Sequence, residues 1–555
     1  MQDSAAPSAC AFTPMPVDTI LDAAVRRFAA RPALDFLGQR TSYAGLGALV
    51  ARAAAGLQKL GVTKGVAVGL CLPNTPYSVI MYFAVLKAGG TVVNFNPLYT
   101  VGEIEEMVRD AGVAIMVSLD AAVIHAKIGR LAAQGLFKRV IICRLGAALP
   151  PGKRLALSLF GRKGLAHVPE HAPYVEFARL ISGPAQPGPV AIDPEHDIAL
   201  LQFTGGTTGT PKAAMLTHAN IVTNLRQVHQ VMPPVVEGEE RFLAILPFFH
   251  VFAMTAVMNF GLSIGAELLL LPRLDLKQLM RAIRRRRPSV LPAVPTLLTA
   301  LNNAAGARAK WLRCFKFCVS GGAALPAEVR QRFERLSGAV ILEGYGLSET
   351  APVVALTRLK DLKPGSVGQA LPGTVIEIRD PADPARLLPT GAHGEICVRG
   401  PQVMHGYANQ PVETAQAFVE GAFRTGDIGY LDADGCLFIV DRIKDVIICG
   451  GFKVYPRIIE EAACQHPAVQ DAAAIGIADS YRGQSPKLFV TLRAGERATE
   501  AELMAFLEER LNRIEMPRAL EIRASLPRTP VGKLAKKELL AQEEAAGRGL
   551  GAAGA

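Results

Sequence analysis

A loop rich in glycine and threonine follows an apolar, strand-like run near the middle of the chain. Residues 199–203 lead directly into Thr204-Gly205-Gly206-Thr207-Thr208-Gly209-Thr210-Pro211-Lys212. The glycines let consecutive backbone N–H groups converge on one anion, because no Cβ atom obstructs the approach. The threonine hydroxyls add donors, and the lysine adds a mobile positive charge. The Walker pattern GxxxxGK[ST] does not fit these residues, so the loop predicts a polyphosphate site of another kind.

Five further motifs carry residue types that suit nucleotide chemistry. They are Ser320-Gly321-Gly322-Ala323, Glu343-Gly344-Tyr345-Gly346-Leu347-Ser348-Glu349-Thr350, Thr425-Gly426-Asp427, the pair Arg442 and Lys444, and Pro527-Arg528-Thr529-Pro530-Val531-Gly532-Lys533. In this order, and together with the loop, they resemble the motifs of the adenylate-forming superfamily. That superfamily includes acyl-CoA synthetases, luciferases and peptide-synthetase adenylation domains. The resemblance covers residues 30–540 or so.

The resemblance implies a role for each motif. Tyr345 would stack on the adenine, Ser348 would approach a phosphate, and Asp427 would accept from the ribose hydroxyls. Thr204 and Glu349 would bind Mg²⁺, and the catalytic residues would be Lys533, Glu349 and His250. The ATP-binding residues would be Thr204, Gly205, Gly206, Thr207, Thr208, Gly209, Lys212, Gly322, Ala323, Glu343, Gly344, Tyr345, Gly346, Ser348, Asp427, Arg442 and Lys444. Coenzyme A would contact Gly450, Gly451 and Lys453.

The segment Leu246-Pro247-Phe248-Phe249-His250-Val251-Phe252-Ala253-Met254-Thr255 bears on the substrate. With residues 343–350, 400–404 and 441–442, it is most similar to bacterial long-chain fatty acid–CoA ligases. This similarity implies acyl-binding roles for His250, Phe252, Met254 and Gly321. Residues 248–251 contain no aspartate to pair with a substrate amine, which favours a plain carboxylic acid with an apolar tail. A buried core element explains Met254 and Met258 nearly as well as an acyl tunnel does.

The first hypothesis is therefore ATP-dependent ligation of a long-chain fatty acid to coenzyme A through an acyl-adenylate, which releases AMP and pyrophosphate. A medium-chain or aryl acid–CoA ligase and a fatty acyl–AMP ligase are alternatives within the enzyme class. A weakly active acyl-binding paralogue is a third. Its motivation is three departures from the family pattern: Ala213 for glycine, Ile458 for glutamate, and Ile514-Glu515 for a Tyr-Lys pair.

Composition limits the class of protein and its partners. With 555 residues, half of them hydrophobic and 20% charged, the chain is long enough for two or more domains. The net charge of +11 suits anionic partners and equally suits solubility alone. Nine scattered cysteines without a CxxC pair argue against disulfides and zinc and favour the cytoplasm. We expect no nucleic-acid partner, because no aromatic residues alternate with the arginines. The resemblance leaves a homodimer open.

Two basic segments raise the question of membrane contact. Lys153, Arg154, Arg162 and Lys163 flank the apolar run 155–160, for which a solvated connecting loop is preferred over a patch on an anionic membrane. Residues 284–287 are all arginine, and a solvated helix end is preferred over a site for coenzyme phosphates or anionic lipid. No signal peptide is visible, and prolines interrupt the uncharged stretches 65–86 and 242–266, so no membrane span is expected.

Alternating helical and strand-like segments must position these motifs. The helical pattern at 43–60 and 77–87 alternates with short apolar runs at 65–71, 90–94, 113–118 and 139–143, which predicts a largely parallel sheet flanked by helices. The expected fold is α/β, with mostly parallel sheets and a β-barrel-like part in a large N-terminal domain, residues 1–440. A hinge at 441–446 would lead to a small, mobile α+β domain at 447–540 and a disordered tail at 541–555.

Overall fold

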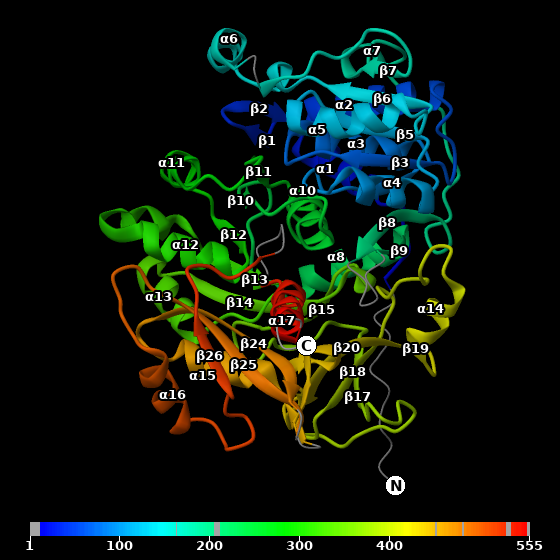
Figure 1. The fold of residues 1–555 in the computed structure, drawn as a ribbon. Helices are drawn as coiled ribbons and strands as arrows, with labels where there is room; N and C mark the ends of the chain where they lie inside the picture. Colours follow the sequence, from blue (N-terminus) through cyan, green and yellow to red (C-terminus); the bar gives the residue numbers. More distant parts are fainter. Residues whose placement is uncertain are drawn as a thin grey trace.

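The fold contains four β-sheets, shown in a computed structural model of the chain (Figure 1). The structure describes residues 12–161, 164–204, 211–449, 452–479, 482–528 and 534–551. The blue and cyan amino-terminal part lies at the top of Figure 1, and the orange carboxyl-terminal sheet lies at the bottom left. Green elements that carry several of the predicted motifs occupy the space between them.

Two large sheets are mostly parallel and confirm the predicted α/β class. The nine-stranded sheet has the order β16-β15-β14-β13-β12-β10-β11-β1-β2, and the seven-stranded sheet has the order β7-β6-β5-β3-β4-β8-β9. The strands of the first are β1 Pro32–Phe36, β2 Gln39–Ser42, β10 Arg241–Ala244, β11 Glu267–Leu270, β12 Val290–Ala293, β13 Phe317–Gly321, β14 Val340–Gly346, β15 Val353–Leu356 and β16 Gln369–Ala370. The strands of the second are β3 Ala67–Cys71, β4 Thr91–Asn94, β5 Ile115–Leu119, β6 Arg139–Cys143, β7 Tyr174–Glu176, β8 Ile198–Thr204 and β9 Lys212–Thr217.

Helices cover these sheets and are capped where the chain leaves a strand. Thr217, at the end of β9, accepts a hydrogen bond from the N–H of Asn220, whose side chain accepts from the N–H of Thr217 in return. The helices are α1 Asp18–Phe28, α2 Tyr43–Lys59, α3 Pro76–Lys87, α4 Val101–Asp110, α5 Ala122–Ala133, α6 Pro151–Phe160, α7 Phe177–Leu180, α8 His218–Val231, α9 Val251–Ala253, α10 Phe260–Ser263, α11 Leu276–Arg286, α12 Pro295–Ala305, α13 Ala327–Ser337 and α14 Pro411–Gln416. Short 3₁₀ segments lie at η1 Leu145–Ala148, η4 Gly306–Cys314, η5 Ser348–Thr350 and η6 Ile443–Asp445, and η3 Met254–Asn259 is a π-helix.

Two smaller sheets follow in the second half of the chain. An antiparallel sheet occupies the place of the expected barrel-like part, with β17 Val375–Arg379, β18 Gly394–Arg399, β19 Phe418–Val419, β20 Ala422–Leu431 and β21 Leu437–Arg442. The carboxyl-terminal sheet has its own apolar core and comprises β22 Ile447–Cys449, β23 Phe452–Val454, β24 Val469–Asp479, β25 Gly483–Leu492 and β26 Ala519–Ile522. Its helices are α15 Pro456–Cys464, α16 Glu500–Glu508 and α17 Lys536–Gly551. The domain limits at 441 and 447 stay predictions.

The structure corrects two expectations about individual segments. The tail from residue 541 was expected to be disordered, but α17 continues to Gly551, because Ala, Leu, Gln and Glu outnumber glycine over most of that stretch. Residues 151–160 were expected to be a loop, but they form α6, which starts with Pro151 at its first position. Among the described residues, no helix has the length and apolar character that a membrane crossing requires.

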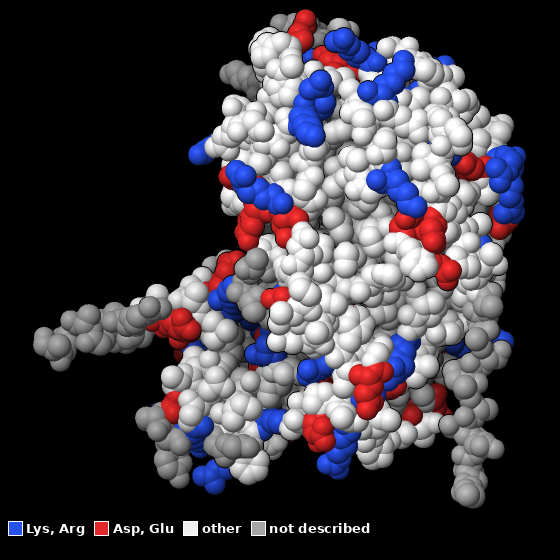
Figure 2. All heavy atoms as spheres, turned by 90° about the vertical axis from the view of Figure 1, so that its right-hand side faces the viewer, with Lys and Arg blue, Asp and Glu red and all other residues white. Residues whose placement is uncertain are grey.

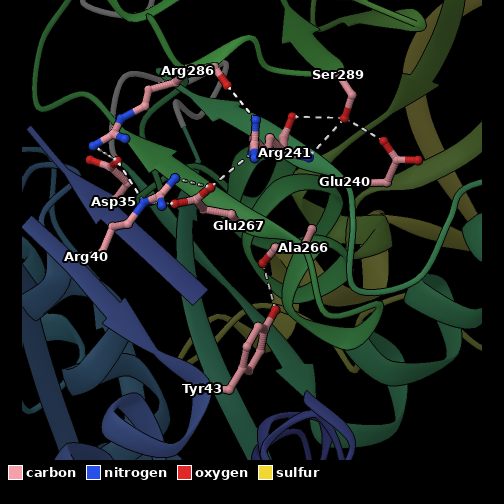
Figure 3. A network of polar contacts seen from close by, with 9 residues as sticks. All are labelled: Asp35, Arg40, Tyr43, Glu240, Arg241, Ala266, Glu267, Arg286 and Ser289. Atoms are coloured by element: carbon pink, nitrogen blue, oxygen red, sulfur yellow. Dashed lines mark hydrogen bonds and ion pairs between the residues drawn. The ribbon is translucent and has the colours of Figure 1, made fainter. Parts of the chain in front are cut away.

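A network of charged side chains ties β1 and β2 to β10, β11 and the end of α11 (Figure 3). The buried carboxylate of Asp35 lies 2.6 Å from Arg286 Nη2. The buried Glu267 lies 2.8 Å from Arg40 Nε and 3.2 Å from Arg241 Nε. Pairing offsets part of the desolvation of these carboxylates, although burial still raises the pKa of Glu267. Arg286 is therefore a structural side chain, which corrects the prediction of a solvated helix end for this member of the arginine run.

Candidate active site

The carboxyl ends of neighbouring parallel strands carry most of the predicted motifs. The loop that begins at Thr204 leaves β8, and the segment leading to His250 follows β10. Gly321 ends β13, and Gly346 ends β14. In open α/β sheets, ligands bind beyond the carboxyl ends of the strands. The fold therefore collects residues from across 150 or so positions of sequence on one side of the sheets.

The two ends of the phosphate loop are joined by strand pairing. Thr204 and Lys212 are partners in the antiparallel pair of β8 and β9, and residues 205–210 lie outside the described residues. The Ala213 side chain is fully buried, and its backbone is not left-handed, so the position does not require glycine. Its carbonyl accepts from the N–H of Ala408 at 2.9 Å. Ala213 is thus an ordinary strand residue, and this departure gives no support to an inactive paralogue.

Glu349 lies in η5 directly after β14, with 8% of its surface exposed. Its carbonyl accepts from the N–H of Met404, and its Oε1 accepts from the hydroxyl of Tyr407 at 2.9 Å. Burial raises the pKa of the Glu349 carboxyl, and the hydrogen bond from Tyr407 opposes that rise. Nζ of Lys212 lies 5.4 Å from the centre of the Tyr407 ring. One tyrosine therefore connects the carboxylate and the ammonium group predicted to bind ATP.

The residues around Glu349 fit a magnesium ion that is held mainly by a nucleotide. Within the described ranges, no three His, Cys, Asp or Glu side chains gather closely enough to form a metal site by themselves. Mg²⁺ commonly takes only one or two protein carboxylates and completes its shell with phosphate oxygens and water. A buried carboxylate with a raised pKa is stabilised by a cation. Glu349 suits that role, while Thr204 stays a predicted ligand.

Tyr345, Asp427 and Arg442 form a second cluster across three strands. The Tyr345 hydroxyl donates to Asp427 Oδ2 at 2.7 Å, and Arg442 Nε lies 3.3 Å from Asp427 Oδ1. Asp427 and Arg442 are direct partners in the pairing of β20 with β21. Burial raises the pKa of the Tyr345 phenol, so it remains a hydrogen-bond donor at neutral pH. The structure thus brings together three of the residues predicted to bind ATP.

Other residues of the motif 343–350, which begins in β14, make contacts that support the structure. Glu343 accepts from Arg330 Nη1 at 2.8 Å, so its carboxylate is already paired with α13. A Cβ atom on Gly346 would lie 1.9 Å from the carbonyl oxygen of Pro352, which makes glycine necessary there. Ser348 begins η5, one residue before Glu349. These contacts fix the turn that presents Glu349.

Two of the predicted acyl-binding residues, Phe252 and Gly321, lie next to each other at the end of β13. A Cβ atom on Gly321 would meet Phe252 Cζ at 3.5 Å and the carbonyl oxygen of Gly344 at 3.3 Å. The Phe252 ring therefore lies against the backbone where β13 and β14 end. Gly322, with φ +80°, and Ala323 follow and are exposed. A side chain at position 321 would fill the space beside this ring.

Met254 lies deeper than the other predicted acyl-binding residues. It is fully buried at the start of the π-helix η3, and its sulfur lies 3.8 Å from Asn94 Nδ2. Met258, on the same π-helix, is 1% exposed. Isolated π-helical turns occur often at functional sites. Both methionines pack in the apolar core, as the core interpretation expected.

Buried amides that the sequence analysis did not single out hold the His250 turn in place. The Asn74 side chain donates to the carbonyl of Leu246 at 2.8 Å and accepts from the N–H of Phe248 at 2.9 Å. Gln202 of β8 donates to the carbonyl of Phe249 at 3.1 Å. The phosphate-loop strand is thereby joined to the turn before His250. Gln202, a polar residue within the otherwise apolar run just before the phosphate loop, is the signal that sequence reading could have used.

The predicted coenzyme A residues and the catalytic lysine are only partly described. Lys453 is an exposed residue of β23, whereas Gly450, Gly451 and Lys533 lie outside the described residues. Lys444 has an exposed side chain in η6, and desolvation of its ammonium group by the surrounding protein, together with the nearby Arg442, lowers its pKa. The structure therefore places Lys444 near the Asp427 cluster and leaves the roles of the other residues as predictions.

The predicted hinge residue links β21 to the carboxyl-terminal sheet. Asp441 accepts from the N–H of Arg442 with one carboxylate oxygen and from the N–H of Arg457, at the start of α15, with the other, both at 2.8 Å. Across the same boundary, Arg493 makes two hydrogen bonds to Glu328, at 3.0 and 2.6 Å. These contacts join the carboxyl-terminal sheet and α15 to β21 and α13.

Ile458 and Ile514, two other departures from the family pattern, are also accommodated. Both side chains are partly buried and pack against the apolar core of the carboxyl-terminal sheet. The neighbouring Glu515 accepts from the N–H of Asn512 at 3.2 Å. These positions therefore contribute to the stability of that core.

Comparison with known proteins agrees with this arrangement. Residues 21–408 match the model of the AMP-binding enzyme family, and residues 458–533 match that of the AMP-binding enzyme C-terminal domain. The chain belongs to the AMP-binding enzyme family. The motif resemblance is thereby confirmed, and the family's two matched regions lie on either side of Asp441.

Named relatives of this AMP-binding enzyme include long-chain-fatty-acid–CoA ligases. One from Bacillus subtilis is 40% identical over 537 residues, which is 95% of this chain and 94% of the relative. Another, from Escherichia coli O6:H1, is 35% identical over 541 residues, with the same coverage. Among solved structures, ATP-bound MatB from Rhodopseudomonas palustris superposes with a TM-score of 0.82 at 27% identity, covering 95% of this chain and 98% of that one.

Proposed function

We propose that this AMP-binding enzyme joins a long-chain fatty acid to coenzyme A at the cost of ATP, with AMP and pyrophosphate as the other products. The observation that carries the proposal is the full-length similarity to two long-chain-fatty-acid–CoA ligases, at 40 and 35% identity. The clusters of Glu349 with Tyr407 and of Asp427 with Tyr345 support it, because they supply a buried carboxylate and a polar ribose-side pair. Both suit a nucleoside triphosphate.

The reaction has two half-reactions. A carboxylate oxygen attacks the α-phosphorus of ATP, the α–β phosphoanhydride breaks, and pyrophosphate leaves with the electron pair. The sulfur of the coenzyme A thiolate then attacks the acyl carbon, and AMP leaves. Bringing a carboxylate to a triphosphate requires neutralisation of charge, to which Lys212 and Lys533 would contribute. Mg²⁺ held at Glu349 and Thr204 would neutralise further phosphate charge.

The acyl tail would extend past Phe252 and Gly321. The Phe252 ring is only partly buried and lies over glycine backbone, so an apolar chain can cover it and lose no polar contact. His250 directly precedes the helix that carries Phe252 and would lie beside the adenylate. Gly321→Val would narrow this space, so the variant should prefer shorter acids than the wild type does.

One assay tests the function. Pyrophosphate release and thioester formation are measured with acids of graded chain length, with and without coenzyme A, and Glu349→Gln serves as the inactive control. We expect both products, with the highest kcat/KM for long-chain acids. Pyrophosphate without thioester would indicate an acyl–AMP ligase, and a preference for aryl or medium-chain acids would indicate the other alternative. If no acid led to release of pyrophosphate, the proposed enzymatic function would be excluded.

We also propose contact with an anionic membrane through the α6–α11 surface, defined here by Leu155, Leu159 and the basic residues near them. Leu155 and Leu159 of α6 are 61 and 63% exposed. The basic residues are Lys153, Arg154, Arg281, Arg284 and Arg285, all exposed. Desolvation lowers the pKa of Lys153, and the guanidinium groups of Arg281, Arg285 and Arg286 in α11 lower it further, so these charges act on the start of α6. Apolar side chains among cations suit an acidic lipid surface.

Another face of the molecule carries charges of both signs. In Figure 2, which views the right-hand side of Figure 1, Lys and Arg are interspersed with Asp and Glu. Sedimentation with vesicles that contain phosphatidylglycerol tests the proposal. Leu155→Asp with Leu159→Asp should reduce binding, whereas Val412→Asp, at a 63% exposed position on α14, should not. Equal vesicle binding by the wild type and both variants would refute membrane contact through the α6–α11 surface. Separately, sedimentation velocity of the protein without vesicles tests for the homodimer.

A further inference from the structure

Tyr407 makes contacts with two proposed ATP-binding residues that approach it from different elements. Its hydroxyl donates to Glu349 Oε1 at 2.9 Å, and its ring lies 5.4 Å from Lys212 Nζ. Glu349 comes from η5 and Lys212 from the start of β9. The two contacts use different parts of one side chain, so they can form at the same time. Tyr407 therefore fixes where these two groups lie relative to each other.

The backbone around Tyr407 is held independently of the two contacts. The segment 405–408 pairs with β9: His405 N–H donates to Met215, Met215 N–H donates to Gly406, and Ala408 N–H donates to Ala213. The N–H of Tyr407 donates to Thr414 Oγ1 at 2.9 Å. These hydrogen bonds fix the backbone of Tyr407, so the point from which its side chain starts does not depend on the contacts with Glu349 and Lys212.

The arrangement keeps two opposite charges available for a ligand. Across the described part of the chain, Lys212 forms no ion pair with a carboxylate, although a long lysine side chain readily finds one. An aromatic face attracts an ammonium group without neutralising it. A phenol likewise donates to a carboxylate and leaves its negative charge in place. Both charges can then act on a triphosphate and its cation.

We propose that Tyr407 is a positioning residue for ATP, with its hydroxyl orienting Glu349 toward the metal-bound phosphates and its ring orienting Lys212 toward the phosphates directly. This rests on the proposed function for the identity of the ligand. It predicts two separable losses. Removing the hydroxyl should lower ATP affinity only when Mg²⁺ is present. Removing the ring should lower ATP affinity whether or not Mg²⁺ is present.

The test compares Tyr407→Phe, which loses only the hydroxyl, with Tyr407→Leu, which loses the ring as well. Binding of ATP to the full chain is measured by titration calorimetry with and without Mg²⁺. For Tyr407→Phe we expect affinity to fall about tenfold with Mg²⁺ and to stay unchanged without it, as for a lost hydrogen bond to a charged group. For Tyr407→Leu we expect a further fall of about threefold in both conditions. The matched control is Tyr430→Phe, which removes the hydroxyl of a tyrosine on β20 that stacks on Phe438 and should leave ATP affinity unchanged.

A double-variant cycle distinguishes positioning from a general loss of structure. In a Glu349→Gln background, Tyr407→Phe should cost much less Mg²⁺-dependent affinity, because the hydroxyl acts through the Glu349 carboxylate. Thioester formation from supplied acyl-adenylate should be unchanged in Tyr407→Phe. Wild-type affinity in Tyr407→Phe, or an equal loss with and without Mg²⁺, would overturn the proposal. Absence of thioester in the wild type would refute the proposed function instead and leave the binding comparison valid.

Discussion

The hydroxyl of Tyr345 lies 2.7 Å from Oδ2 of Asp427, although 82 residues separate them in sequence. The contact joins the end of β14 to the middle of β20 and so connects the nine-stranded sheet to the antiparallel sheet. In the proposed complex these residues contact adjacent parts of adenosine, the base and the ribose. The hydrogen bond would therefore set the angle between the two parts of the nucleotide site.

Loss of this hydrogen bond should weaken ATP binding. Tyr345→Phe keeps the ring but leaves Asp427 with one partner fewer, so we expect KM for ATP to rise by about tenfold, with little change in kcat. The measurement is pyrophosphate exchange as a function of ATP concentration. Asp427→Ala should cost more, and adding Tyr345→Phe to it should have little further effect. Fully additive losses would contradict the coupling.

Lys533→Ala should separate the two half-reactions. The resemblance assigns this lysine to adenylation, so its loss should slow pyrophosphate release by about 10²–10³, in the range seen when one charge-stabilising group is removed. Conversion of supplied acyl-adenylate to thioester should remain within about twofold of wild type, because that step does not use the lysine. Single-turnover assays of each step provide the measurement. Equal losses in both steps would refute the assignment.

Gly346→Ala should distort the turn that presents Glu349. The new Cβ atom would lie 1.9 Å from the Pro352 carbonyl oxygen, and this oxygen belongs to the backbone and cannot move aside alone. We expect ATP binding to fall below detection and the free energy of unfolding to fall by about 1–3 kcal/mol. Gly102→Ala is the control, because nothing lies within 4 Å of its added Cβ atom in α4. That variant should bind ATP normally and be equally or more stable.

His218 should make the stability of the chain depend on pH. Its ring is 1% exposed, and its Nδ1 accepts a hydrogen bond from the N–H of Val17 at 3.1 Å, which protonation would break. Burial lowers the His218 pKa from 6.5 to about 4. Between these pH values the unfolded chain binds more protons than the folded one, so stability decreases as pH falls from 6.5 toward 4, by up to about 3 kcal/mol.

His218→Asn tests this because asparagine keeps an acceptor near the Nδ1 position and does not titrate. Urea midpoints are measured from pH 7.5 to 4.5 for both proteins. The wild type should lose more stability than the variant across this range, and the gap should open below pH 6.5. Parallel curves would show that His218 does not contribute.

Local patterns predicted much of the fold. The helix expected at 43–60 is α2, and the strand expected at 139–143 is β6, because the apolar spacing in each fits one period and the segments are flanked by turns. The strand before the phosphate loop was also found at its expected place, β8. By contrast, α6 was missed because two of its leucines, Leu155 and Leu159, are exposed, so its apolar residues do not follow the pattern of a helix with one buried face.

The candidate site was less predictable than the motifs that point to it. Residue types indicated Glu349, Asp427 and Lys212, but nothing local indicated Tyr407, which lies 58 positions from Glu349 and meets it only through strand pairing. Asn74 was missed for the same reason, since two of its partners lie 170 and 172 residues away. Contacts of this kind depend on which distant strands become neighbours, and a single sequence does not record that.

The pairing of β9 with residues 405–408 has a consequence for engineering. In a chimera that takes only residues 218–403 from another parent, β9 and residues 405–408 both still come from this chain. A chimera with a single junction between 217 and 404 would instead take the two members of this pairing from different parents. The second design would match a foreign Tyr407 segment to this β9. The unit formed by β9 and residues 405–408 is therefore discontinuous in sequence. Crossover points are best chosen so that both of its segments come from the same parent.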